Sequence, residues 1–325
     1  MLVWVWPKVQ EVPRTMTHTL YIIGNGFDLH HGIPSAYSAF GRYLSERDHE
    51  TSDIVERYFY VDKDFWSEFE QRLASFDSDT LIEDAAQFLV SYSADKWSDS
   101  FHHDYQFEIN RVVEALSSTM QSHFAEWIRK LPIPNPAFIR TSRLPIDPKA
   151  KFLNFNYTSS LQQLYAVQDA QILHIHGSAT DPDAALVLGH GWEPENLDPY
   201  RFETDPEDAD MRVVEGVQLI DEYFKNTFKP AQQILDDNIS FFENLNTVRE
   251  IFVMGHSLSD VDLLYFQEVI RCVDSTQVRW LVSYYGDLSQ TRERFSMLGI
   301  NPALVQFALL SDFKFPMGGN GAISD

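Results

Sequence analysis

The sequence predicts an α/β fold in which a parallel sheet is flanked by helices. Short apolar runs rich in β-branched and aromatic residues end in Gly, Asn or His, and a helical pattern usually follows each run. The runs are continuous rather than alternating, which is typical of parallel strands buried on both faces. This alternation of strands and helices predicts a Rossmann-like sheet.

Seven segments carry the strand pattern. They are Thr19–Ile23, Lys151–Phe155, Gln171–Ile175, Ala185–Leu188, Glu250–Met254, Val278–Tyr284 and Val305–Leu310. Helical periodicity is expected over Val213–Phe228 and Ala231–Leu245. The expected strands therefore lie at the start of the chain and after residue 150.

A helical insertion is expected at 39–149, between the first two strands, because this stretch has helical periodicity over most of its length. Its apolar stripes comprise Phe65, Trp66, Phe69 and Leu73, then Phe107, Val112, Val113, Leu116, Met120, Phe124 and Trp127. We expect the insertion to pack over the sheet and cover the site. We expect residues 16–38 and 150–315 to form the α/β domain, with an extra arm at 1–15 and a flexible tail at 316–325.

The charge and the cysteine content of the chain exclude some classes of partner and site. The chain has 325 residues, and its 25 basic against 48 acidic residues give a formal charge of -23, which repels nucleic acid and anionic lipid. We expect no direct nucleic-acid contact and no membrane association. Cys272 is the single cysteine, so an intramolecular disulfide and a cysteine-based zinc site are excluded. A reducing cytoplasm fits this composition.

The turn Gly24-Asn25-Gly26 follows the first strand and precedes a helix. Backbone N–H groups can converge there on an anion, and glycine removes the Cβ that would block the approach. Phe27 and Asp28 continue the motif, and Gly32-Ile33-Pro34 is expected to close a loop over whatever the turn holds. A tight structural turn without a ligand explains GxG alone equally well.

Two further strand ends carry polar side chains. Asn156 follows a strand, so its amide is expected at the carboxyl edge of the sheet, where open α/β folds bind ligands. The alternative is an asparagine that only satisfies local backbone. His174 and His176 share one strand face. His176 lies nearest the end, before Gly177, and can accept a proton near neutral pH, whereas His174 is expected to be a hydrogen-bonded core residue.

The motif Gly255-His256-Ser257 again joins a strand to a helix. Ser259 is expected to cap that helix, and Asp260 and Asp262 fall in its first turn, where carboxylates favour the positive helix end. That capping role is a sufficient explanation for Asp260.

These motifs resemble known families. GNGFDLHHGIP is similar to the GAGxSxxxGIP opening of sirtuins; Gly24, Gly26, Gly32, Ile33 and Pro34 match, and Asn25 and Asp28 depart from it. The ordered set GNGFD, FNYT, HIHG and GHSLSDVDLLYF, from Thr19 to about Phe266, more closely resembles the bacterial AbiH family of phage abortive-infection proteins, which is similar to a divergent sirtuin-like branch.

The resemblance implies an effector that depletes NAD, its substrate, giving nicotinamide and ADP-ribose. The pyrophosphate would lie against Gly24–Gly26, while Asn156 orients water and His176 acts on a ribose hydroxyl. It implies NAD contacts at Gly24, Asn25, Gly26, Phe27, Asp28, Gly32, Ile33, Pro34, Tyr157, Thr158, Gly177, Gly255, His256, Ser257 and Asp260. No metal is expected. Such an enzyme needs restraint in healthy cells, by the insertion or by a homo-oligomeric interface.

Other interpretations stay open. The pocket could hold a nucleotide as a sensor or interaction module without turning it over. A metal-dependent hydrolase could use His176, His190 and His256 if these strand ends converge with Asp28 or Asp260. Protein deacylation is disfavoured, because one cysteine excludes the four-cysteine zinc module usual in sirtuins. The phage-derived trigger and the oligomeric state are not determined by the sequence.

Overall fold

The structure is a computed structural model that describes residues 18–91, 103–182, 184, 186–194 and 210–313. Within these residues, six strands form one parallel sheet in the order β3-β2-β1-β4-β5-β6. The strands are β1 (Thr19–Ile23), β2 (Lys151–Asn154), β3 (Ile172–His174), β4 (Glu250–Met254), β5 (Arg279–Tyr284) and β6 (Val305–Leu309). The Rossmann-like prediction is confirmed. Strand order reverses between β1 and β4, so their carboxyl ends form the topological switch point.

Two expectations about local structure were wrong. Residues 186–188 form no strand, because they cross the end of the sheet: Val187 N–H donates to His176 O at 2.9 Å, and Tyr157 Oη donates to Val187 O at 2.7 Å. The helix expected over Ala231–Leu245 is two helices, interrupted at Asn238, whose side chain donates to the Ile234 carbonyl. The regions expected as an arm at 1–15 and a tail at 316–325 lie outside the described residues.

Helices cover both faces of the sheet because successive strand residues point to opposite faces. Leu20 and Ile22 pack toward helices α10 to α13, whereas Tyr21 and Ile23 pack toward α1 and α8. Tyr21 stacks between Phe152 and Phe252 of the neighbouring strands, at centroid distances of 5.0 and 5.2 Å. These helices are α1 (Asn25–His30), α8 (Ser160–Tyr165), α10 (Ala231–Asp237), α11 (Ile239–Glu243), α12 (Leu263–Cys272) and α13 (Leu288–Ser296).

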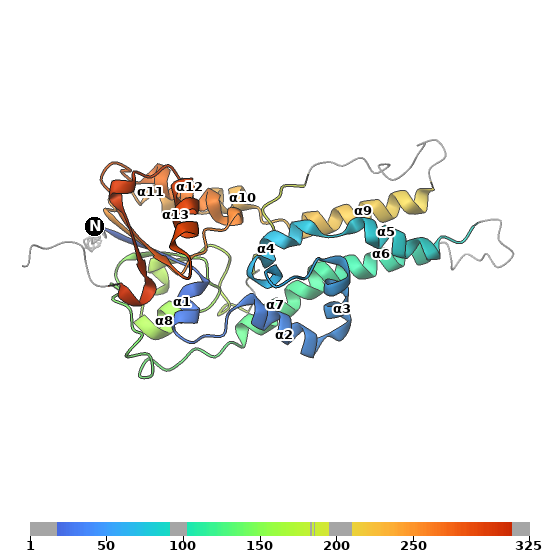
Figure 1. The fold of residues 1–325 in the computed structure, drawn as a ribbon, viewed down its shortest axis with the longest axis horizontal. Helices are drawn as coiled ribbons and strands as arrows, with labels where there is room; N and C mark the ends of the chain where they lie inside the picture. Colours follow the sequence, from blue (N-terminus) through green and yellow to red (C-terminus); the bar gives the residue numbers. More distant parts are fainter. Residues whose placement is uncertain (1–17, 92–102, 183, 185, 195–209, 314–325) are drawn as a thin grey trace, which may run out of the picture.

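The remaining α-helices of the described chain gather beyond one end of the sheet (Figure 1). We call them the helical body: α2 (Tyr37–Arg47), α3 (His49–Tyr58), α4 (Phe69–Arg72), α5 (Ser78–Ala85), α6 (Asp104–Glu114), α7 (Met120–Arg129) and α9 (Met211–Asn226). A π-helical turn, η5 (Ala115–Thr119), joins α6 to α7. Helix α9 lies outside the expected insertion in sequence but packs along α6. No helix of the described residues is long and apolar enough to cross a membrane.

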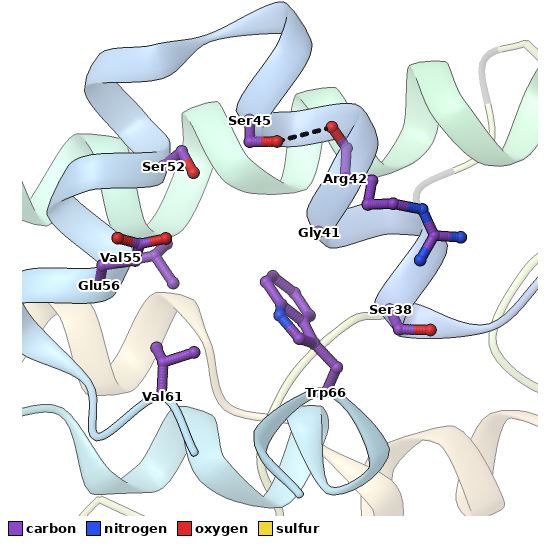
Figure 2. A pocket seen from close by; sticks show the side chains of 9 residues that line it. All are labelled: Ser38, Gly41, Arg42, Ser45, Ser52, Val55, Glu56, Val61 and Trp66. Atoms are coloured by element: carbon purple, nitrogen blue, oxygen red, sulfur yellow. Dashed lines mark hydrogen bonds between the residues drawn. The ribbon is translucent and has the colours of Figure 1, made fainter. Parts of the chain in front are cut away.

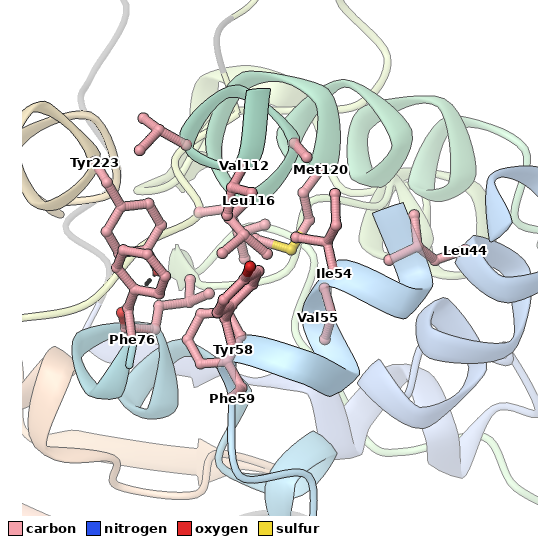
Figure 3. Packing of buried hydrophobic residues seen from close by; sticks show 14 of the residues in the cluster. Leu44, Ile54, Val55, Tyr58, Phe59, Phe76, Val112, Leu116, Met120 and Tyr223 are labelled. Carbon is pink, nitrogen blue, oxygen red and sulfur yellow. Dashed lines mark hydrogen bonds between the residues drawn. The ribbon is translucent and has the colours of Figure 1, made fainter. Parts of the chain in front are cut away.

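The helical body has its own aromatic core (Figure 3). Tyr223 of α9 contacts Phe76 with ring centroids 4.6 Å apart, which ties α9 to the first half of the chain. The expected stripes are buried or half-buried, except at Phe107, which is 69% exposed. The buried face of α6 follows Tyr105, Ile109 and Val112 at helical spacing. Phe107 is two residues from Tyr105 and points elsewhere, so its assignment to the core was wrong.

The helical body also has a partly open pocket of about 300 Å³ beside α2 and α3 (Figure 2). Trp66 forms one wall, and its ring lies on Gly41, where an added Cβ would come within 2.4 Å of the indole. The pocket is lined by Ser38, Gly41, Arg42, Ser45, Ser52, Val55, Glu56, Val61 and Trp66. None of these residues belongs to the four sequence motifs.

We expect Leu116→Ala to lower the free energy of unfolding by about 2–5 kcal/mol, because it deletes a fully buried side chain and leaves a cavity. Phe107→Ala, on the adjoining helix, should change it by no more than about 0.5 kcal/mol, as for other exposed positions. Urea denaturation followed by circular dichroism measures both. Equal losses in the two variants would contradict the packing described.

Candidate active site

The turn after β1 packs directly on the loop after β4. Gly24 N–H donates to Met254 O at 3.0 Å, and Gly26 N–H donates to Gly255 O at 2.7 Å. A Cβ on Gly24 would lie 2.6 Å from His256 Cα, and one on Gly255 would lie 2.1 Å from Phe27 N. The close approach of two backbones at the switch point therefore requires these glycines.

The same packing occupies backbone donors of the turn. Gly24, Gly26 and Phe27 all donate their N–H groups to carbonyl groups of the protein, Phe27 to Gly24 O at 2.9 Å. In this conformation these three donors do not face a ligand. A structural turn thus accounts for the glycines without an anion.

The loop at Gly32-Ile33-Pro34 folds back on the turn, as its offset predicts. Gly32 has φ +79°, a left-handed conformation that glycine adopts without strain. Ile33 N–H donates to Asp28 O at 3.0 Å, and the Asn25 amide donates to Ser35 O at 3.0 Å. This loop leads to α2, the first helix of the helical body.

Asp28 is the centre of one buried network at the sheet edge. Thr158 Oγ1 donates to Asp28 Oδ2 at 2.5 Å, and Ser160 Oγ donates to Oδ1 at 2.6 Å. Burial raises the pKa of Asp28 to about 6, against the opposing hydrogen bonds from Ser160, Thr158 and Asn156. Asn156 Nδ2 also donates to Gly24 O at 3.1 Å. We call these four residues, Asp28, Asn156, Thr158 and Ser160, the Asp28 network; it holds the end of β2 against the turn after β1.

A second buried group, the Asp262 cluster, lies where the helical body meets the sheet. It comprises Asp262 of the 3₁₀ turn η7 (Asp260–Asp262), Glu70 of α4, Lys229, His176 and His256. Lys229 Nζ lies 3.1 Å from Asp262 Oδ1 and also pairs with Glu70. His176 Nε2 lies 3.6 Å from Asp262 Oδ1, and His256 Nε2 lies 3.5 Å from Oδ2. One carboxylate therefore faces an ammonium group and two imidazoles.

Burial and charge set the protonation of this cluster. Burial lowers the pKa of His256 to about 3 and holds the pKa of His176 well below its usual value, with Lys229 adding to both effects. Burial opposes the charge of Lys229, but Asp262 and Glu70 outweigh it and raise the lysine pKa. Burial also raises the pKa of Asp262. At neutral pH Lys229 is charged and both imidazoles are neutral.

The expected pair Asn156 and His176 lies at the ends of adjacent strands, since Asn154 pairs with His174 in the sheet. The side chains enter different networks: Asn156 faces Asp28 and Gly24, whereas His176 faces Asp262. The Phe155 ring packs against His176, with 5.4 Å between the ring centroids. The structure thus brings the two residues near one edge but gives each its own partners.

Of the other expected NAD contacts, Tyr157 and Thr158 are buried here, whereas Ser257 and Asp260 are exposed. Gly177 is half-buried beside His176. In the motif that carries both aspartates, the buried carboxylate is Asp262 rather than Asp260. Sequence reasoning assigned no site role to Asp262, Glu70 or Lys229. The sequence offers a signal for only one of these residues: Asp262 lies within the GHSLSDVDLLYF motif.

The imidazole rings of His174 and His190 have other neighbours than Asp262. His174 is a hydrogen-bonded core residue, as expected, with Nδ1 3.0 Å from Asn156 O and Nε2 3.1 Å from the Gln162 amide. His190 pairs through its backbone with Thr227 and Lys229, and its ring lies beside Trp192. Of the three histidines considered for a metal site, His176 and His256 both face Asp262, whereas the His190 ring lies beside Trp192 and Phe224. Across the described parts of the chain, no three His, Cys, Asp or Glu side chains are grouped to hold a metal ion.

Comparison with known proteins places the sequence of this chain in a family. The family model for bacteriophage abortive infection AbiH matches residues 20–284, which run from β1 to the end of β5 and include the helical body. No curated protein and no solved structure matches the chain.

Gly255→Ala should lower the free energy of unfolding by about 3 kcal/mol or more, since φ +70° is strained for alanine and its Cβ would overlap the backbone at Phe27. Gly286→Ala is the matched control: its φ is +72°, but no atom lies within 4 Å of the added Cβ. It should lose only about 1–2 kcal/mol. Similar losses in chemical denaturation would contradict the close packing of the two loops.

Asp28→Asn tests the buried carboxyl through pH. Asp28 has a folded-state pKa raised from 3.8 to about 6, so the native state binds the extra proton and its stability falls as pH rises from about 4 to 6. Relative to the variant, the natural protein should lose about 3 kcal/mol across this window. Urea denaturation at several pH values measures the difference. A difference that does not change with pH would show that Asp28 titrates normally.

Proposed function

Because the chain belongs to the AbiH family of bacteriophage abortive infection proteins, we propose that it is an effector that hydrolyses NAD to nicotinamide and ADP-ribose after infection. Family membership implies the role in abortive infection. The reaction is our inference, and the observation that carries it is the placement of Asn156 and His176 at adjacent strand ends beside the switch point.

The chemistry of these two side chains supports glycosidic cleavage. Such bonds break through an oxocarbenium-like state, which is helped by a base acting on the sugar and by an oriented water. His176 is neutral at neutral pH because burial lowers its pKa, so it can accept a proton. Asn156 would hold the water with its amide. The exposed Ser257 and the neighbouring Gly255 would contact the adenosine side.

The burial of the site supports a restrained resting state. Asn156 and His176 are only 5% and 3% exposed, and Glu70 of the helical body is part of the Asp262 cluster. NAD could reach them only after the helical body moves relative to the sheet edge. We therefore assign this conformation to the protein before infection, with the trigger acting on that movement.

A catalytically silent nucleotide-binding sensor or interaction module is the second candidate. The occupied N–H groups of Gly24, Gly26 and Phe27 and the internal partners of Asp28 favour its form as an interaction module, because these groups do not face a ligand. In that case the protein would protect cells without consuming NAD.

Infected bacteria that express the chain distinguish the two functions, because the phage itself supplies the trigger. We expect infection to deplete NAD, to release ADP-ribose and nicotinamide, and to lower plaque formation. Asn156→Ala and His176→Ala should keep NAD at the uninfected level and lose protection, because each removes one reacting group. His49→Ala, at an exposed histidine of α3, is the matched control. Mass spectrometry of cell extracts measures the nucleotides.

Protein levels and melting of the purified variants show that each one folds. Protection by the natural chain with unchanged NAD would favour the silent module. Full NAD depletion by both site variants would overturn the assignment of Asn156 and His176.

A further inference from the structure

His256 has a defined proton. Leu258 N–H donates to His256 Nδ1 at 2.9 Å, so this nitrogen is an acceptor and the proton of the neutral ring lies on Nε2. That N–H faces Asp262 Oδ2 at 3.5 Å. Lys229 donates to the other oxygen, Oδ1, at 3.1 Å. The N–H groups of both side chains therefore point toward the carboxyl oxygens of Asp262.

His176 presents the opposite situation. The Phe155 carbonyl acts on the His176 ring, and we assign this interaction to Nδ1 because the buried Nε2 has no hydrogen-bond partner. The neutral ring then carries its proton on Nδ1 and directs a bare Nε2 at Asp262 Oδ1, 3.6 Å away. Two acceptors in contact in a buried site repel each other. The gap is also too short for a water molecule to bridge.

We propose that His176 and Asp262 share one proton between Nε2 and Oδ1, and that Asp262 is the positioning residue for His176. This inference deepens the proposed function, on which its catalytic meaning rests. When the pair holds this proton, we expect Oδ1 and Nε2 to close from 3.6 Å to hydrogen-bond distance, with Asp262 O–H donating to His176 Nε2. Loss of that proton to solvent frees Nε2, which can then accept the proton of a ribose hydroxyl and become an imidazolium beside the Asp262 carboxylate.

The helical body takes part in this balance through Glu70. Its carboxylate pairs with Lys229 and so offsets the ammonium charge that would otherwise favour ionised Asp262. The titratable groups that face the pair come from every element packed around it: Glu70, Lys229, His256, Tyr37, Tyr157 and Tyr265. Movement of α4 would therefore change the proton affinity of the pair.

Nitrogen-15 NMR of the full chain labelled at histidine tests the shared proton without any substrate. His176→Gln assigns the resonances of His176. We expect Nε2 of the natural protein to report a hydrogen bond at low pH and a bare nitrogen once the pair loses its proton. Asp262→Asn should abolish this titration, whereas Asp236→Asn, at an exposed aspartate of α10, should leave it unchanged.

Glu70→Gln leaves both members of the pair intact and guards against misfolding of the Asp262 variant. Removing this negative charge should lower the proton affinity about tenfold, so Nε2 becomes bare about one pH unit lower. An Nε2 signal that is the same in natural, Asp262→Asn and Glu70→Gln proteins would overturn the shared proton.

NAD turnover separates this inference from the proposed function. In extracts of infected cells, turnover by the natural protein should rise with pH as the pair loses its proton. Asp262→Asn should lower it about 100-fold or more and remove this pH dependence. An NMR titration as described but no NAD turnover would sink the reaction alone. Turnover by Asp262→Asn with the natural rate and pH profile would sink the positioning role alone.

Discussion

The buried ammonium group of Lys229 joins the two parts of the molecule. It follows α9 of the helical body, is 1% exposed, and pairs with Glu70 of α4 and Asp262 beyond β4. A buried charge that loses its partners costs several kcal/mol, so the helical body cannot leave the sheet edge unless water reaches Lys229. The position of the helical body and the electrostatics of the sheet edge are therefore coupled.

Two networks of buried polar side chains flank the end of β2. The Asp28 network binds Asn156 to the turn after β1, and the Asp262 cluster holds His176 under the helical body. The direct contact of Gly26 with Gly255 leaves the backbones at the switch point no room for side chains. This packed and internally bonded edge supports the resting state that we propose, in which the centre becomes active only when the helical body is displaced.

Much of the fold follows from local sequence. Continuous apolar runs such as Thr19–Ile23 are typical of strands buried on both faces, which favours a parallel sheet with helices on each side. The offset of Gly32 from Gly24 likewise determined a loop that returns to the turn, because only glycine enters φ +79° without strain. Phe107 shows the limit: one apolar residue on a helix does not reveal which face is buried.

The sequence by itself predicted the parallel sheet, six of its strands, and the strand ends that carry Asn156, His176 and His256. Only the tertiary structure decided which of these side chains meet. Glu70 and Lys229 lie 159 positions apart, and no local pattern marks either of them. They come together because a buried ammonium needs carboxylates from whichever elements pack around it, and packing across the whole chain selects those elements.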